Sequence, residues 1–244
     1  RQEMDAQART DPDRVFCTFG DQVLRFGALD DAVNRVANGL LAQGLRPGDR
    51  VALMLPSHPD HIVCIFALAK IGRVRVPVNT SLKGPSLDHP FQAFAVDALI
   101  ADTAYAEALA PVLARRKLRA VFWRGGTAPG QPDFEDLLHP QNRAAPPVQP
   151  RPDDIIAITP SSGTTGAPKG VLKSDRTLRA GPLAVLRLTE AEPGDTLLFW
   201  EAMHHGAGVA VLISAGRRVA AVWKPAALGA VVGIGARTIG HALL

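Results

Sequence analysis

The chain has 244 residues, enough for one large or two small domains, and its 47% hydrophobic and 20% charged residues are typical of a globular protein. The formal net charge is +4, but only 5% of the residues are aromatic, and Lys and Arg are spread along the chain. A nucleic-acid-binding face combines clustered basic residues with aromatic ones, so we expect no nucleic-acid partner. No apolar run approaches the roughly 18 residues of a membrane span, and no signal peptide is visible. We therefore expect a cytoplasmic protein without an integral membrane segment.

The spacing of cysteine and histidine gives no indication of a metal site. Cys17 and Cys64 lie far apart in the sequence and match no metal or redox motif, so we expect buried or partly buried thiols. His204 and His205 are adjacent, and no further Cys/His cluster accompanies them. The sequence therefore predicts no metal held by side chains of this type.

Strand-like and helix-like segments alternate over the first half of the chain. Apolar, β-branched runs predict a hairpin at 15–26 and strands at 50–55, 74–78, 98–101 and 118–123. Apolar spacings of three and four residues predict helices at 28–41, 59–71, 82–94 and 104–118. This alternation predicts a layered α/β domain with largely parallel strands. The Pro- and Gly-rich residues 125–152 are expected to form a surface connection.

Residues 159–170 have the composition of a phosphate-binding loop and follow a predicted strand at 154–159. They read Thr-Pro-Ser-Ser-Gly-Thr-Thr-Gly-Ala-Pro-Lys-Gly. Glycines let backbone N–H groups turn toward an anion, hydroxyls add donors, and the lysine adds a positive charge. The Walker A spacing is not met, because Pro168 stands where that motif has its second glycine. The ordered string favours a phosphate loop over the alternative, a mobile Gly/Ser linker.

This string resembles the phosphate loop of the AMP-forming adenylating enzymes, which include acyl-CoA synthetases, luciferases and peptide-synthetase adenylation domains. In that family the loop holds the β- and γ-phosphates of ATP while a carboxylate attacks the α-phosphate. The products are an acyl-adenylate and pyrophosphate. The resemblance implies the layered α/β/α N-terminal domain of the adenylate-forming fold, here incomplete. It assigns phosphate binding to Ser161, Ser162, Gly163, Thr164, Thr165, Gly166 and Lys169.

Two segments upstream of the loop carry the same resemblance. Residues 24–29 are similar to the family's Leu-Thr-Tyr-x-Glu-Leu element, with departures at Arg25, Phe26 and Ala28. Residues 69–79 are similar to its Lys-Ala-Gly-x-x-x-x-Pro-Val-Asn segment. The Pro-Val-Asn form favours acyl-CoA synthetases over peptide-synthetase domains.

A second candidate site follows the strand-like run at 195–200. The family has a Pro-x-x-His-x-x-Gly element here, whose histidine lies near the adenylate and the acyl pocket. His205 and Gly208 match that spacing, while Ala202 replaces the proline. Two interpretations of His205 stay open, a functional residue and a structural or solvated one. A general-base role is unsupported, because carboxylates are already ionised at neutral pH.

The resemblance implies an acyl-CoA synthetase-type ligase that uses ATP with Mg²⁺ and takes CoA as co-substrate, with Lys169 and His205 as catalytic residues. Its partner would be a small-molecule carboxylate. The family's adenine- and ribose-binding elements and its C-terminal domain are not found in the sequence, so residues 1–222 are expected to be a partial, truncated N-terminal AMP-binding domain. The alternatives are a non-catalytic nucleotide-binding remnant and an adenylating ligase with a different acceptor.

The tail at residues 223–244 differs from the rest of the chain. It is rich in Gly and Ala and has little amphipathic order. Our hypothesis is that this tail results from a frameshift or from mis-termination. Translating the coding DNA in its other frames beyond residue 216 tests it, because the hypothesis fails if neither frame restores the missing motifs.

Overall fold

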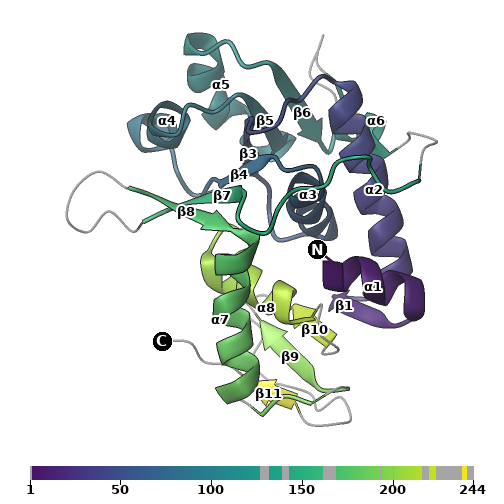
Figure 1. The fold of residues 1–244 in the computed structure, drawn as a ribbon. Helices are drawn as coiled ribbons and strands as arrows, with labels where there is room; N and C mark the ends of the chain where they lie inside the picture. The colour runs from purple at the N-terminus through teal and green to yellow at the C-terminus, as the bar shows by residue number, and fades with distance from the viewer. Residues whose placement is uncertain are drawn as a thin grey trace. The chain divides into compact units, whose positions relative to one another are not determined.

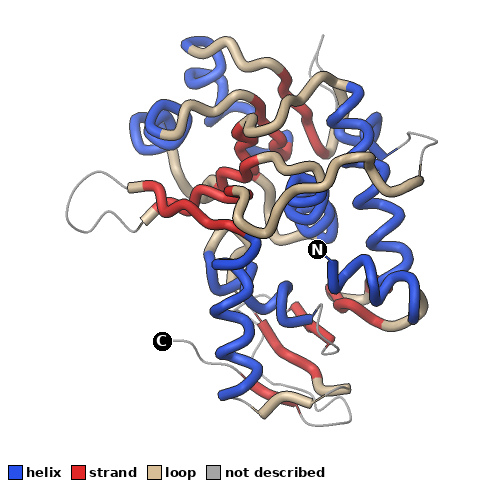
Figure 2. The backbone as a smooth tube through the Cα atoms, in the orientation of Figure 1, coloured by secondary structure: helices blue, strands red, loops and turns tan. Residues whose placement is uncertain are grey.

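The computed structural model describes nine stretches of the chain, which are residues 2–126, 132–138, 143–161, 169–188, 190–192, 194–199, 201–215, 220–223 and 238–240. These stretches divide into two compact units. The larger unit comprises residues 32–175, and the smaller unit comprises residues 1–31 together with 176–244. Figure 1 labels the helices and strands, and Figure 2 distinguishes them by colour. Each unit is described by itself.

The larger unit is built on a sheet that, among the described residues, has six strands in the order β6-β5-β3-β4-β7-β8. Its strands are β3 (Arg50–Met54), β4 (Val74–Pro77), β5 (Ala98–Asp102), β6 (Ala120–Arg124), β7 (Ile155–Pro160) and β8 (Gly170–Ser174). Neighbouring strands run parallel, except that β7 and β8 form an antiparallel hairpin. The predicted parallel α/β character is therefore confirmed.

Helices cover both faces of this sheet. Its helices are α2 (Phe26–Ala42), which starts in the smaller unit, α3 (Pro59–Lys70), α4 (Gly84–Ala93), the 3₁₀ turn η1 (Thr103–Tyr105), α5 (Ala106–Arg115) and α6 (Phe134–Leu138). α4 and α5 pack on one face, while α2, α3 and α6 lie on the other side (Figure 1). Val51 and Leu53 alternate along β3 with Ala52 and Met54, and all four are fully buried. The larger unit therefore has the predicted three α/β/α layers.

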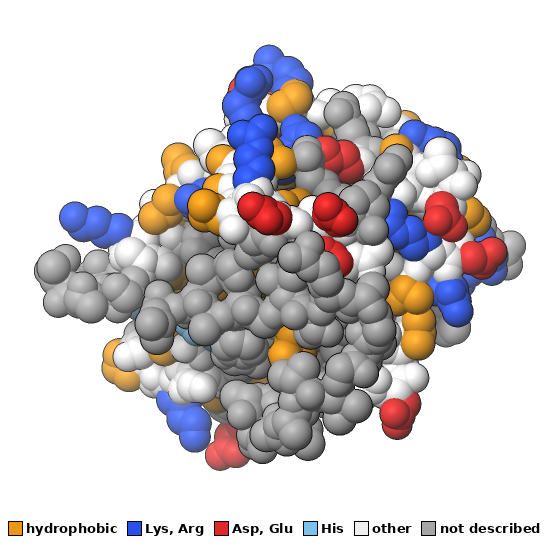
Figure 3. Space-filling model, turned by 90° about the horizontal axis from the view of Figure 1, so that it is seen from below, with side chains coloured by type: hydrophobic (Ala, Val, Ile, Leu, Met, Phe, Trp, Pro, Cys, Tyr) orange, Lys and Arg blue, Asp and Glu red, His pale blue; other side chains and the backbone are white. Residues whose placement is uncertain are grey.

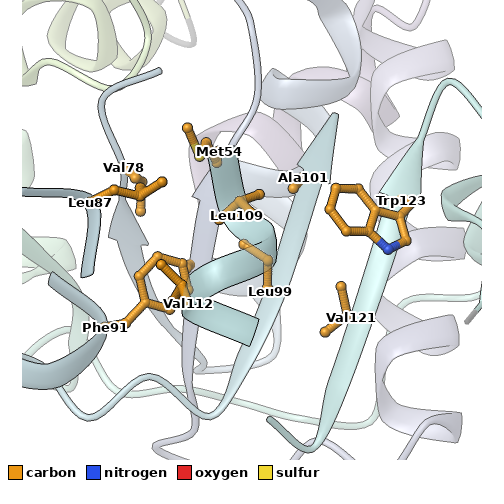
Figure 4. Close-up of a cluster of buried hydrophobic side chains, with 11 residues drawn as sticks. Met54, Val78, Leu87, Phe91, Leu99, Ala101, Leu109, Val112, Val121 and Trp123 are labelled. Atoms are coloured by element: carbon orange, nitrogen blue, oxygen red, sulfur yellow. The ribbon is translucent and has the colours of Figure 1, made fainter. Parts of the chain in front are cut away.

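The core beneath α4 and α5 consists of side chains from alternate strand positions (Figure 4). Met54, Leu99 and Val121 come from three adjacent strands, and they meet Phe91 of α4 and Val112 of α5. Strands that are buried on both faces read as continuous apolar runs, which explains why the sequence identified them.

The connection between β6 and β7 contains more structure than the sequence indicates. The sequence predicts a surface connection over 125–152, but α6 forms within it and buries Phe134 and Leu137. The Nδ2 atom of Asn34 on α2 also donates a hydrogen bond to the carbonyl oxygen of Arg143 at 3.0 Å. Part of this connection therefore belongs to the helical layer.

The smaller unit contains a second sheet, whose order among the described residues is β11-β9-β10-β1-β2. Its strands are β1 (Val15–Phe19), β2 (Gln22–Arg25), β9 (Thr196–Phe199), β10 (Ala220–Trp223) and β11 (Thr238–Gly240). β1 and β2 form the predicted antiparallel hairpin, while β1 pairs in parallel with β10. Its helices are α1 (Gln2–Thr10), α7 (Asp175–Leu188) and α8 (Gly206–Ala215), and α8 packs on β9 and β10.

Both cysteines are buried free thiols, as the sequence predicts. Burial raises the pKa of Cys17 to about 12 and that of Cys64 well above its ordinary value, so neither is a reactive thiolate at neutral pH.

In the part of the chain that the structure describes, no helix has the length and apolarity needed to cross a membrane.

One buried arginine lies in the middle of the larger sheet. Arg75 of β4 pairs through its backbone register with Ala157 of β7, and its side chain is only 4% exposed. Burial lowers the pKa of its guanidinium to about 10. Its Nη1 atom has no hydrogen-bond partner among the described residues. Such a group costs stability, because desolvation is not offset by a new hydrogen bond.

A charged cluster joins the carboxyl ends of β5 and β6 to the first turn of α3. Arg124 donates hydrogen bonds to Asp60 at 2.5 Å and to Asp102 at 2.7 Å. The Nη2 atom of Arg124 also lies 2.8 Å from Nε2 of His58. Burial alone would raise the pKa of Asp60, but hydrogen bonds with His58 and Arg124 outweigh it and lower the pKa below its ordinary value. Ionised Asp60 therefore stabilises the fold.

We predict that Asp60→Asn lowers the free energy of unfolding at pH 7 by about 1–2 kcal/mol, because a charge-assisted hydrogen bond is lost. A lowered pKa makes this stabilisation complete above the unfolded-state value of about 3.9 and lost as the pH falls below it. The difference between the two proteins in urea denaturation should therefore shrink below about pH 4.

Asp154→Asn is the matched control, since Asp154 also bonds an arginine, Arg151, but on the surface. We expect a smaller change for this variant, because its ion pair with Arg151 is exposed to solvent. An equal loss of stability in both variants would contradict a specific role for the Arg124 cluster.

Candidate functional site

The predicted phosphate loop connects β7 to β8, and its two ends are held together. In the hairpin Pro160 lies opposite Gly170. The N–H of Ser161 donates to the carbonyl oxygen of Lys169 at 2.7 Å, and the N–H of Lys169 donates to Oγ of Ser161 at 2.9 Å. We call this pair of residues the loop neck. The neck therefore holds the two ends of the intervening segment side by side at the end of the β7–β8 hairpin.

The site residues predicted from the sequence divide into those that the structure describes and those that it does not. Ser161 and Lys169 form the neck, and both are exposed to solvent. The Oγ atom of Ser161 accepts the Lys169 N–H, which leaves its own hydroxyl hydrogen for donation. The other predicted residues lie outside the described stretches, namely Ser162, Gly163, Thr164, Thr165 and Gly166.

Close packing at Gly170 fixes the neck against the core of the larger unit. A Cβ atom at this position would lie 2.6 Å from Cγ2 of Ile158 and 2.7 Å from Cε1 of Phe94. Phe94 and Ile158 are both buried, at 6% and 5% exposure, and belong to one apolar cluster. Only glycine therefore allows the chain to leave the loop at this place without displacing the core.

The predicted histidine element lies in the smaller unit, between β9 and α8. The N–H of His205 donates to the carbonyl oxygen of Ala202 at 2.9 Å, and α8 begins at the next residue. Met203 is fully buried, whereas His205 is exposed. A Cβ at Gly208 would lie 2.9 Å from the Ala202 carbonyl oxygen. The backbone of this turn is therefore fixed at both ends, and it presents His205 to solvent.

His204 is a candidate that the sequence does not single out. Its side chain is half-buried, and its ring centroid lies 4.4 Å from that of His205 with an angle of 46° between the planes. Burial, with a smaller effect of His205, lowers the pKa of His204 to about 4, so this ring is neutral at physiological pH. Only its adjacency to His205 could have indicated it, and adjacent residues do not usually stack.

The charged and metal-binding side chains add little further chemistry. No group of three or more His, Cys, Asp or Glu that could hold a metal ion occurs in the described stretches. Figure 3 shows one face of the molecule, on whose described part both Lys/Arg and Asp/Glu side chains are exposed. The described chemistry therefore consists of the neck in one unit and the histidine turn in the other.

Comparisons with known proteins point to one family. A model of the family described as AMP-binding enzyme matches residues 4–227. A feruloyl-CoA synthase of Amycolatopsis sp is 31% identical over 206 residues, covering 84% of this chain and 39% of that protein. The long-chain-fatty-acid–CoA ligase FadD13 of Mycobacterium tuberculosis is 30% identical over 209 residues, covering 84% of this chain and 40% of that protein. The chain thus spans about two-fifths of the length of these curated relatives.

Solved structures share the fold. The inhibitor-bound N-terminal domain of FACL13 from Mycobacterium tuberculosis matches with a TM-score of 0.82 at 24% identity, covering 92% of this chain and 56% of that one. The long-chain-fatty-acid–CoA ligase FadD1 from Archaeoglobus fulgidus matches with a TM-score of 0.81 at 22% identity, covering 91% of this chain and 45% of that one. The predicted adenylate-forming N-terminal fold is therefore confirmed.

We predict that Gly170→Ala destabilises the larger unit by about 1–3 kcal/mol, because an added methyl group must displace Ile158 or the Phe94 ring. The matched control is Gly206→Ala at the first residue of α8, where a Cβ would meet nothing within 4 Å. Replacing a helical glycine by alanine should leave stability unchanged or raise it by about 0.5–1 kcal/mol. Chemical denaturation compares the two variants, and equal effects would show that the neck is not tightly packed.

Proposed function

We propose, because the chain belongs to the AMP-binding enzyme family, that it is the ATP-phosphate-binding part of an AMP-forming acid–CoA ligase. The relatives that match it are acyl-CoA ligases. In the proposed reaction, a carboxylate oxygen attacks the α-phosphorus of ATP and the bond to pyrophosphate breaks. The thiol of CoA then attacks the acyl carbon of the adenylate, which releases AMP and a proton and forms the thioester.

The loop neck is the observation that carries this proposal. Hydrogen bonds between Ser161 and Lys169 close the loop, so the Lys169 ammonium group projects from a fixed backbone position. A charged donor held beside a loop rich in hydroxyls and glycines suits the β- and γ-phosphates and the leaving pyrophosphate. We assign that role to Ser161, Lys169 and the loop residues 162–166.

His205 is assigned to the carboxylate and adenylate side of the reaction. Its ring is exposed at the first turn of α8, where backbone N–H groups also favour negative charge. The carboxylate is already ionised at neutral pH, so this histidine has no proton to remove from it. Its proposed contribution is to orient the acid by hydrogen bonding.

Mg²⁺ enters the proposal as the usual companion of ATP. Protein sites generally hold this ion through one or two carboxylates together with substrate phosphates. The described residues contain no group of three or more His, Cys, Asp or Glu that could hold a metal ion, and we propose that the ion arrives with the phosphates. CoA is the proposed acyl acceptor, in line with the relatives' names.

A second candidate function is a nucleotide-binding module that does not complete the reaction. The chain spans about two-fifths of the relatives' length, and positioning of the nucleotide normally supplies a large share of the rate. A third candidate function is an adenylating ligase whose acceptor is not CoA. It differs from the acid–CoA ligase only in the acceptor of the acyl group.

The first experiment measures pyrophosphate release from ATP with a panel of aromatic and long-chain carboxylates. Release that depends on the acid, together with thioester formation on addition of CoA, supports the ligase. ATP binding without release supports the non-catalytic module. Acid-dependent release without thioester formation supports a different acceptor, and failure to bind ATP contradicts all three.

The second experiment tests the neck through nucleotide affinity. Lys169→Ala should weaken ATP binding about 10- to 150-fold in calorimetry, since a charge-assisted hydrogen bond to phosphate contributes roughly 1.5–3 kcal/mol. Lys173→Ala on β8, the strand that follows the neck, is the matched control, because it removes the same charge four residues away. Equal affinities in the two variants would rule out the assigned role of Lys169.

A further inference from the structure

We infer that His204 is a positioning residue, whose ring holds the imidazole of His205 in a single orientation. The expected effect of His204 on catalysis rests on the proposed function, in which His205 orients the carboxylate substrate. The orientation itself is a property of the turn and is measured without any reaction.

The backbone of the turn is fixed by contacts on both sides of the histidine pair. Met203 is fully buried, so the turn is anchored immediately before His204. Gly208 packs against the carbonyl oxygens of Glu201 and Ala202, where a Cβ would come within 3.1 Å and 2.9 Å. The backbone N–H of His205 is bound to the Ala202 carbonyl oxygen at 2.9 Å. These contacts place the Cα atom of His205 but leave its side chain in solvent.

The ring of His204 supplies the missing restraint on that side chain. The two ring centroids lie 4.4 Å apart at a tilt of 46°, so the two rings are in direct contact. His204 is itself half-buried, and its Nε2 atom is shielded from solvent without a hydrogen-bond partner among the described residues. A ring held in this way has little freedom to move, so it acts as a fixed surface for its neighbour.

The charge state of His204 suits this role. Burial keeps its pKa at about 4, so the ring is neutral under physiological conditions. A neutral ring can contact His205 whether or not His205 carries a proton, whereas a charged ring would repel the protonated form. His204 needs no hydrogen bond to substrate, and it acts only through His205.

The inference predicts different results for two substitutions. His204→Phe keeps a flat, uncharged ring of similar size, so the orientation of His205 should be retained. His204→Ala removes the ring and frees the His205 side chain. Under the proposed function, His204→Ala should lower kcat/KM for pyrophosphate release about tenfold. This is less than the roughly hundredfold that a 1 Å misplacement costs, because His204 acts only through His205. The Phe variant should stay within about twofold of the parent.

NMR of the His205 side chain tests the orientation directly, in the same chain and without substrate. In the parent protein the three-bond couplings between Hα and the two Hβ protons of His205 should show a single χ1 rotamer. His204→Ala should average these couplings over several rotamers, while His204→Phe should keep the single-rotamer values. The same couplings of His89, which lies in the larger unit, provide an internal reference that should not change in either variant.

The results separate this inference from the proposed function. If His205 keeps its single-rotamer couplings in the Ala variant, His204 does not position it and the inference is overturned. If the couplings become averaged in Ala and stay single-rotamer in Phe, the inference stands even where no pyrophosphate is released, and only the ligase proposal fails. In an active protein, equal kcat/KM for the parent and the Ala variant would also overturn it.

Discussion

The antiparallel return of β8 along β7 is the constraint on which the candidate phosphate site depends. β7 belongs to a parallel sheet through its pairing with β4, so its direction is set by the layers around it. The chain must then turn back within one loop to pair with the same strand. The neck hydrogen bonds between Ser161 and Lys169 follow from that pairing. Gly170, the first residue of β8, packs against Phe94 and Ile158. The two ends of the loop are therefore fixed by the core of the larger unit.

A rigid base has consequences for anion binding. A loop that is mobile at its ends must lose conformational entropy when it binds a phosphate chain, whereas a loop with fixed ends loses less. The layers that fix these ends are held by apolar packing in their centre and by the Arg124 cluster at their margin, where strand ends meet solvent. Binding residues on a loop thus have the position of its two ends set by a scaffold that the ligand never contacts.

The sequence predicts most of the central strands and helices, because strands buried on both faces are continuous apolar runs and their helices have regular apolar spacing. It does not predict β8, whose Val171 and Leu172 are both exposed at the margin of the sheet and show no alternation. It also omits α7, whose pattern is interrupted by Gly181 and Pro182. Arg75 looks like a solvent-facing strand residue in sequence, yet its strand is central. Strand order is set by long-range packing, which local patterns do not contain.

The two candidate sites share one structural device, although they belong to different units. In each, a glycine without room for a Cβ atom fixes the backbone beside an exposed polar residue, with Gly170 next to Lys169 and Gly208 three residues after His205. The sequence identifies the glycines by spacing but not the close contacts that require them. Each glycine fixes the backbone position of the nearby polar residue, Lys169 in one site and His205 in the other. The side chain at that position then determines the chemistry of the site. In the second site the backbone fixes the position of His205 but not the orientation of its ring. We assign that orientation to contact with the ring of His204.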